Sequence, residues 1–177
     1  DHCRFGTQDS TGLGIKLEKM LWGSWTPHKV KLGVSGCPRN CAEATCKDIG
    51  IVCVDSGYEI HFAGAAGLDI KGTEVLGLVT TEDEAMVYVM ALAQMYREQG
   101  HYFERIYKWA RRVGVDEIRR QMMDEPEKRE TYYARFQASQ KIAQVDPWAE
   151  RAVNGLDAGE FAPLAVLSPH AEARPEV

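Results

Sequence analysis

The residues that decide the fold read VKLGVSGCPRNCAEATCKDIGIVCV and occupy positions 30–54. Apolar and polar residues alternate over residues 29–34, which predicts a strand with one buried face. Residues 49–54 are almost continuously apolar and predict a fully buried strand. After a turn sequence, residues 58–62 alternate again, so the last two runs are expected to form a hairpin. The glycine-rich residues 63–72 beyond them are interpreted as a plain surface loop.

A cysteine-bearing turn separates the first two strands. Gly36 permits a sharp turn and a close approach of the backbone. Pro38 fixes the backbone at the start of a short helix that is expected to reach about Lys47. On such a helix Cys37 and Cys41, four positions apart, share one face. Two thiolates at the mouth of a sheet suit a metal ion or an iron–sulfur cluster, and buried free thiols are the plainer alternative.

The remainder of the chain is predicted to be mainly helical. Asp9 or Ser10 is suited to cap the first helix, and Thr81 with Glu84 forms the capping box of a longer one. The apolar stripes of these helices, with Phe103 among the inward residues, are assigned to the core. Helices are expected over residues 10–22, 82–99, 101–113, 116–125 and 127–144.

Composition limits the classes of protein that this chain can belong to. The sequence has 177 residues, of which 45% are apolar, enough for a core. Its longest apolar runs fall short of the ~20 residues that a membrane span needs. Asp1 opens the sequence without a starting methionine or an apolar leader, which indicates a piece of a longer protein. Five irregularly spaced cysteines argue against a secreted disulfide scaffold and for a reducing, cytoplasmic compartment.

Charge is unevenly distributed along the chain. The formal net charge is −5, yet residues 1–50 carry seven Lys or Arg and only five Asp or Glu. The negative net charge argues against a nucleic-acid partner for the whole chain. The local positive charge around the cysteines fits an anionic ligand or cofactor, although an ordinary solvated surface explains the lysines equally well.

Four segments of the sequence resemble the sirohaem and [4Fe-4S] domain of nitrite and sulfite reductases. They are similar above all to the C-terminal part of the large subunit of assimilatory NAD(P)H nitrite reductase, over roughly residues 1–115. The segments are CRFGTQDS at 3–10, GLGI at 12–15, PHK at 27–29 and VSGC at 34–37. The resemblance implies an α+β fold, the second half of a reductase domain, with a small mixed or antiparallel sheet covered by helices.

The resemblance also implies a set of cluster ligands. Cys37 and Cys41 match the second cysteine pair of the family, and Cys3 matches the second member of the first pair. The first member would then fall six residues before Cys3, outside this sequence. Cys41 also matches the cysteine that bridges the cluster to the sirohaem iron. Arg39, Lys31 and backbone N–H groups would suit the carboxylates of sirohaem, and Asn40 could add an amide hydrogen bond.

The implied reaction is the six-electron reduction of nitrite to ammonia at sirohaem, fed by a [4Fe-4S] cluster. No catalytic residue is assigned to this chain, because the residues that hold nitrite lie mainly in the preceding half of the family's domain. FAD and NAD(P)H would bind elsewhere in the parent chain, so the isolated piece is expected to be inactive. Expected partners are nitrite, the N-terminal remainder of the polypeptide, a small nitrite reductase subunit and a second copy in a homodimer, without nucleic acid or membrane.

Three segments are predicted for the chain. Residues 1–125 are assigned to the reductase domain, 126–153 to a helical extension that could dock a partner, and 154–177, rich in Ala, Pro, Glu and Gly, to a mobile tail.

Alternatives to a nitrite reductase remain at this point. A sulfite reductase of the same family is the nearest, and a non-catalytic assembly module is another. A zinc domain would use Cys37, Cys41, Cys46 and Cys53, although their spacings are loose for such sites. Cys46 and Cys53 are otherwise interpreted as packing residues, and His61 is expected to face outward from its strand.

Overall fold

The computed structural model describes residues 3–146 and 148–149. The chain divides into two compact units, Asp1–Gln144 and Val145–Val177, and the fold below is that of the first. The tail predicted for residues 154–177 lies outside the described residues. No helix over the described residues is long and apolar enough to cross a membrane.

A mixed four-stranded sheet forms the centre of the first unit, with strand order β1-β2-β3-β6. β1 pairs with β2 in parallel, whereas β2–β3 and β3–β6 are antiparallel. The strands are β1 (Leu32–Ser35), β2 (Ile49–Val54), β3 (Gly57–Phe62) and β6 (Glu74–Val79). The predicted α+β class and the predicted β2–β3 hairpin are both confirmed.

Two strand features between residues 63 and 79 were not predicted. The glycine-rich loop carries a short hairpin of β4 (Ala65–Ala66) and β5 (Ile70–Lys71). β6 itself lacks a clean alternation of apolar and polar residues, because only Leu76 and Val79 of its six residues are buried. A glycine in its middle, Gly77, leaves room for the Met123 side chain, and glycine is normally unfavourable inside a strand.

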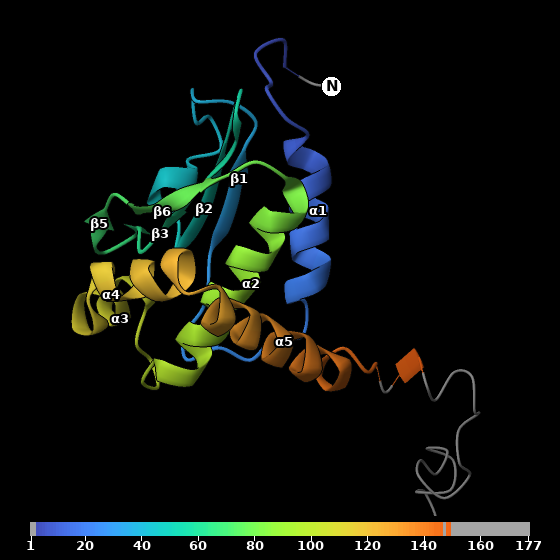
Figure 1. Cartoon of the computed structure of the whole chain (residues 1–177), viewed down its shortest axis with the longest axis vertical. Helices are drawn as coiled ribbons and strands as arrows, with labels where there is room; N and C mark the ends of the chain where they lie inside the picture. Colours follow the sequence, from blue (N-terminus) through green and yellow to red (C-terminus); the bar gives the residue numbers. More distant parts are fainter. Residues whose placement is uncertain (1–2, 147, 150–177) are drawn as a thin grey trace, which may run out of the picture. The chain divides into compact units, whose positions relative to one another are not determined.

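Two helices lie side by side on one face of the sheet, α1 (Ser10–Leu21) and α2 (Glu82–Gln99) (Figure 1). Asp9 caps α1 by accepting a hydrogen bond from the Gly12 N–H at 2.9 Å. α2 begins with the predicted capping box of Thr81 and Glu84. Both helix starts therefore confirm the sequence prediction.

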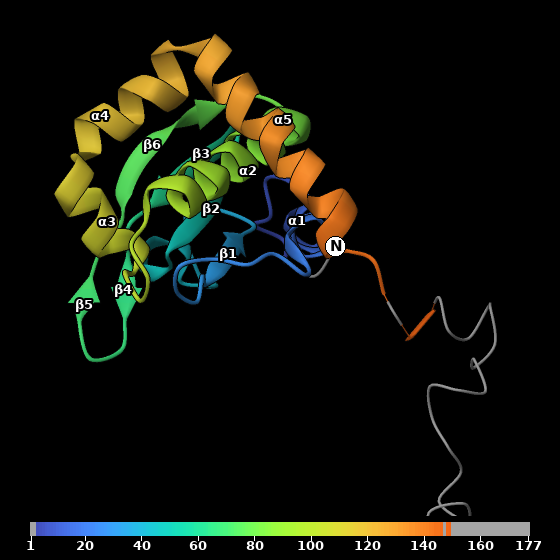
Figure 2. The same cartoon turned by 90° about the horizontal axis from the view of Figure 1, so that it is seen from below.

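The C-terminal helices wrap around the end of α2 and the β6 edge of the sheet (Figure 2). They are α3 (Ile106–Val113), α4 (Val115–Arg119), the π-helical turn η2 (Arg120–Asp124) and α5 (Pro126–Ala143). The α5 helix, which the sequence predicted as an extension from residue 126, packs against α2 and buries Phe136.

The prediction of a helix from residue 101 was wrong for its first five residues. α3 begins only at Ile106, and Phe103 has a left-handed φ of 63° that interrupts any helix. The Phe103 N–H instead donates to the Pro27 carbonyl at 3.0 Å. As a result the Phe103 side chain is exposed rather than inward.

The core lies between the sheet and the helices and includes the largest fully buried side chains, such as Trp109, Tyr96 and Phe62. At its edge the Asp48 carboxylate is fully buried and accepts hydrogen bonds from the Arg105 guanidinium at 2.7–3.0 Å and from the Lys31 N–H at 2.8 Å. This pair ties the starts of β1 and β2 to the start of α3.

His61 is buried, so the prediction that it faces outward was wrong. Its Nδ1 lies 3.0 Å from Thr73 Oγ1 and its Nε2 lies 2.7 Å from Glu59 Oε1. The segment that enters β6 covers this face of β3, and the sequence pattern of β3 alone does not reveal that cover.

Candidate functional site

The segment between β1 and β2 is a pair of turns, which makes the predicted helix over residues 38–47 wrong. The Asn40 N–H donates to the Cys37 carbonyl at 3.0 Å, and the Glu43 N–H donates to the Asn40 carbonyl at 2.9 Å. Asn40 and Glu43 both have a left-handed φ of 54°, which an α-helix does not accommodate. Only one 3₁₀ turn follows, η1 (Ala44–Cys46).

The Asn40 side chain holds these turns together. Its Oδ1 accepts hydrogen bonds from Ser35 Oγ at 2.9 Å and from the Ala44 N–H at 2.8 Å, and its Nδ2 donates to Thr45 Oγ1 at 2.6 Å. Asparagine tolerates the left-handed region better than most residues, and this preference is the signal that the sequence analysis missed. Within the described residues Asn40 is therefore a framework residue of the cysteine loop.

The N-terminal segment that carries Cys3 is pinned to this loop. The Thr7 N–H donates to the Gly36 carbonyl at 2.8 Å, and Gln8 Nε2 donates to the Val54 carbonyl at 3.2 Å. Gly36 makes the close approach that the sequence predicted, because a Cβ there would lie 2.9 Å from Ser10 Oγ at the start of α1.

An aromatic contact joins the same two segments. The Arg39 guanidinium lies 3.7 Å from the centre of the Phe5 ring, and that of Arg4 lies 4.8 Å from it. Both distances are in the range of cation–π attraction. Arg39, predicted to meet sirohaem carboxylates, is thus next to the cysteines and contacts Phe5. Lys31, which was given the same role, is near the opposite end of β1, where its Nζ donates to the Ala66 carbonyl at 3.1 Å.

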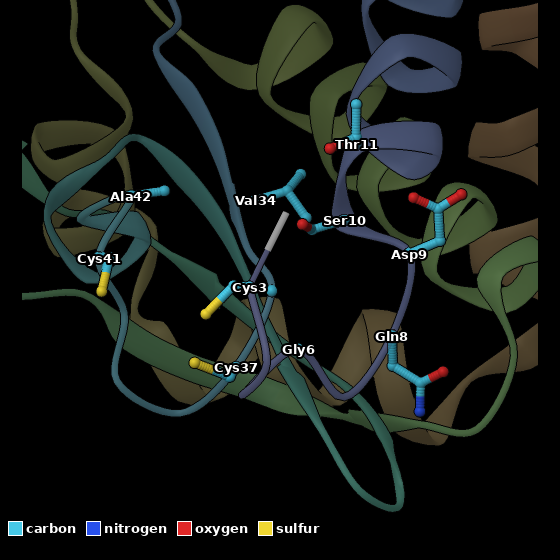
Figure 3. A pocket seen from close by; sticks show the side chains of 11 residues that line it. Cys3, Gly6, Gln8, Asp9, Ser10, Thr11, Val34, Cys37, Cys41 and Ala42 are labelled. Carbon is cyan, nitrogen blue, oxygen red and sulfur yellow. The ribbon is translucent and has the colours of Figure 1, made fainter. Parts of the chain in front are cut away.

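Three cysteines from these two segments line one cavity of about 210 Å³. Figure 3 shows the side chains of Cys3, Cys37 and Cys41 around a common space, opposite Val34 and the start of α1. Cys37 is buried, whereas Cys3 and Cys41 are exposed. The structure therefore brings together the three residues predicted as metal ligands, although the helix predicted to align two of them is absent.

The other two cysteines lie outside this cavity. Cys53 is fully buried in the core, and burial raises the pKa of its thiol to about 11, with a smaller contribution from nearby Cys37. A thiol with that pKa stays protonated and is a poor metal ligand. Cys46 is half-buried, and its Sγ donates to the Glu43 carbonyl at 3.2 Å, so of these two cysteines Cys53 alone is a core residue.

The donor set of the cavity is three cysteine thiols, the side chains that hold a [4Fe-4S] cluster. Residues 3–146 and 148–149 contain no group of three or more His, Cys, Asp or Glu side chains close enough to hold one ion. A [4Fe-4S] cube takes each thiolate on a different iron, so its cysteines do not converge on one point. Zinc on Cys37, Cys41, Cys46 and Cys53 gains no support, because Cys53 is enclosed in the core.

The model of the nitrite and sulphite reductase 4Fe-4S domain matches residues 1–130, which include all three cysteines of the cavity.

Several curated relatives match most of this chain. A nitrite reductase [NAD(P)H] of Bacillus subtilis is 43% identical over 148 residues, covering 84% of this chain and 18% of the relative. The nitrite reductase (NADH) large subunit of Escherichia coli is 32% identical and covers 70% of this chain and 15% of the relative. An assimilatory-type sulfite reductase of Nitratidesulfovibrio vulgaris is 33% identical, covering 68% of this chain and 56% of the relative.

A solved structure supports the same relationship. The NirA protein of Mycobacterium tuberculosis superposes with a TM-score of 0.50 and 25% identity, over 61% of this chain and 22% of that one. The chain spans less than a fifth of the length of the two nitrite reductases named above.

Proposed function

This chain belongs to the nitrite and sulphite reductase 4Fe-4S domain family, and on that premise we propose that it holds the [4Fe-4S] cluster of an assimilatory nitrite reductase. In this proposal the whole enzyme reduces nitrite to ammonia at sirohaem. The chain contributes cluster ligands and one wall of the sirohaem site, and the fourth cysteine comes from sequence outside it.

One observation carries this proposal. Cys3 and the pair Cys37 and Cys41 are more than thirty positions apart in the sequence, yet they line the same cavity. The hydrogen bonds of Thr7 to Gly36 and the contact of Arg39 with Phe5 are what bring them together. Packing of the core does not require this arrangement, because Cys3 and Cys41 are exposed.

The residues of this chain have distinct tasks in the proposal. Cys3, Cys37 and Cys41 would bind as thiolates, the form in which cysteine ligates metals. Asn40 and Gly36 fix the backbone that presents two of them. Arg4 and Arg39, which both contact the Phe5 ring, place positive charge on the two segments that carry the cysteines. When bound, the cluster supplies electrons one at a time.

The finer assignments are part of the same proposal. Sirohaem would lie beside Cys41, with Arg39 and the remaining amide hydrogen of Asn40 near its carboxylates. Nitrite is the proposed substrate. The proposed partners are the rest of the polypeptide, with its FAD and NAD(P)H sites, and a small nitrite reductase subunit. We propose a homodimer as the assembly and the cytoplasm as the location.

The test uses the full-length enzyme and pairs Cys41→Ser with Cys46→Ser. The two cysteines are five residues apart on the same loop, but only Cys41 lines the cavity. We expect Cys41→Ser to lose nitrite reduction together with cluster iron and labile sulfide, while Cys46→Ser retains all three. A Cys41→Ser enzyme with full iron content and activity would refute the proposal.

Sulfite reduction is the second candidate, favoured by the match to the assimilatory-type sulfite reductase, of which this chain covers 56%. The two activities are separated by kcat/KM for nitrite and for sulfite, measured on the same preparation of full-length enzyme. A higher value for sulfite would favour the second candidate and leave the cluster assignment unchanged.

A further inference from the structure

A second cavity, of about 300 Å³, opens at the end of β1 opposite the cysteines. Lys29 and Lys31 line it just before β1, and Arg105, Tyr107 and Lys108 line it from the start of α3. The β4–β5 hairpin forms its other wall, and Figure 2 shows this hairpin projecting beside α3. This cavity shares no lining residue with the cavity of the cysteines, so the two are separate.

The charge of this cavity is positive and largely uncompensated. Among the described residues, Lys29, Lys31 and Lys108 have no carboxylate partner, since Lys31 Nζ donates to a backbone carbonyl and Lys108 Nζ lies 5.7 Å from the Tyr107 ring centre. Arg105 is already paired with buried Asp48. The one acidic lining residue, Asp69, accepts a hydrogen bond from the Tyr107 hydroxyl.

Apolar side chains surround the three lysines. Leu68 and Phe103 line the cavity and are largely exposed, at 108% and 67%. Their neighbours Ile70 and Tyr102 are exposed as well, and the Tyr102 and Phe103 rings are in contact at 4.3 Å between centres. Exposed apolar clusters of this kind mark interaction surfaces, and aromatic residues are enriched at the centres of protein interfaces.

The backbone at Phe103 has an unfavourable conformation that keeps this side chain on the surface. Phe103 has a left-handed φ, which is costly for a bulky residue. The hydrogen bond from its N–H to the Pro27 carbonyl fixes it there, and the His28 ring contacts the Phe103 ring edge-on at 5.8 Å. The outward position of Phe103 is therefore built into the loop.

We propose that this basic, apolar-rimmed surface docks a carboxylate-bearing segment of the same reductase polypeptide, from a part of it outside this chain. The proposal rests on the proposed function, in which the chain works inside a larger enzyme. The two matched nitrite reductases have more than four fifths of their length outside the matched part, so a covering segment is available. Acidic side chains would pair with Lys29, Lys31 and Lys108, and apolar ones would cover Phe103 and Leu68.

Carbodiimide cross-linking of the full-length enzyme, followed by peptide mass spectrometry, tests the proposal directly. This reagent joins a lysine amine to a carboxylate only when the two are in contact. We expect cross-links from Lys29, Lys31 or Lys108 to Asp or Glu residues of the same polypeptide outside positions 1–177. Lys141, an exposed lysine on α5 without a carboxylate partner among the described residues, provides the reference.

Two other outcomes contradict the proposal. Cross-links to a second copy or to another subunit would assign the surface to a different partner. Absence of cross-links, with the three lysines as reactive to acetylation as Lys141, would show that the surface is not covered. The same preparation is assayed for iron and labile sulfide, so a failure of the docking proposal is distinguishable from a failure of the proposed function.

A charge-reversed enzyme with Lys29→Glu, Lys31→Glu and Lys108→Glu provides the second measurement. We expect it to lose the cross-links and to undergo limited proteolysis several-fold faster, while Lys141→Glu leaves both unchanged. Unchanged proteolysis in the triple variant would overturn the proposal even if cross-linking gave no products.

Discussion

The helical body and the cysteine loop of this protein are held together by different means. In the body, fully buried side chains such as Trp109 and Phe136 pack α3 and α5 into one core. In the loop, most side chains are exposed or half-buried, and hydrogen bonds that the Asn40 side chain accepts and donates fix the chain instead. The stability of the body therefore depends on how well its buried side chains fill the core, whereas the conformation of the loop depends on a few polar contacts.

The cysteines show the same contrast. Cys53 belongs to the body, and burial raises the pKa of its thiol to about 11. Cys3, Cys37 and Cys41 belong to the loop end and surround an open cavity. One residue type is thus enclosed in the core in one region and brought to an open cavity in the other.

The largest effect is expected from the body. Trp109 is fully buried and contacts the Tyr96 ring at 5.5 Å between centres. Trp109→Ala should lower the free energy of unfolding by about 3–5 kcal/mol, through lost burial and a cavity. Its Nε1 has no hydrogen-bond partner among the described residues, so Trp109→Phe should cost much less. Urea denaturation followed by circular dichroism measures both.

A matched exposed tryptophan provides the control for this prediction. Trp25 is 84% exposed, and Trp25→Ala should change the free energy of unfolding by less than about 0.5 kcal/mol. Equal losses at Trp25 and Trp109 would contradict the division into a packed body and a loosely packed surface.

The second effect is expected in the loop. Asn40→Ala leaves Ser35 Oγ and the Ala44 N–H without their acceptor and places alanine at a left-handed φ. The cost should be about 1–3 kcal/mol, the usual penalty for unsatisfied buried polar groups. Asn40→Gly accepts the same φ and should cost less. The Ala44 amide should exchange faster with solvent in both variants, and an unchanged exchange rate would refute the framework role of Asn40.

The third effect is a pH dependence at the start of the α3 region. Hydrogen bonds from Arg112 lower the pKa of Glu104 to about 2. Because the folded-state pKa of Glu104 lies below the unfolded value, the Glu104–Arg112 pair stabilises the fold above about pH 5. This stabilisation is lost as the pH falls towards 2. Arg112→Gln should therefore reduce the fall of the urea midpoint on acidification, and only slightly, because Arg112 is partly exposed and solvent screens the pair.

The control for the pH experiment is built into the chain. Glu117 has a similarly lowered pKa, of about 2, caused by Arg120, and it titrates equally in the wild type and in Arg112→Gln. Identical loss of stability between pH 5 and pH 3 in both proteins would show that the Glu104 pair contributes nothing.

The smallest effect is expected from the contact that joins the two cysteine segments. Phe5→Leu keeps an apolar side chain but removes the ring that faces Arg39. The loss of an exposed cation–π contact is worth about 0.5–1 kcal/mol. We expect little change in global stability but faster amide exchange at Thr7, measured against Ile15 on the exposed side of α1.

Apolar periodicity and capping residues predicted the body well, because burial of one face places apolar residues at regular spacings in α2, β2 and β3. The β6 strand escaped prediction because its apolar residues do not alternate and Gly77 interrupts them. The cysteine loop escaped for another reason. Its helix was inferred from the spacing of Cys37 and Cys41, but the left-handed Asn40 sets a different path.

The candidate site itself was only partly predictable. The resemblance to a known family predicts three cysteines as ligands, and the structure places all three around one cavity. The contacts that bring Cys3 there, through Phe5 and Thr7, are long-range in sequence and carry no local pattern. Neither segment alone indicates these contacts, so they were found only in the structure, where the N-terminal segment lies beside the loop.

The central claim is that the N-terminal cysteine and the loop pair serve one cluster. The most direct measurement is iron and labile sulfide per polypeptide in full-length enzyme carrying Cys3→Ser, compared with Cys53→Ala in the core. We predict loss or depletion of the cluster in Cys3→Ser and full occupancy in Cys53→Ala. Full iron and sulfide in Cys3→Ser, with an unchanged spectrum of the reduced cluster, would contradict the account.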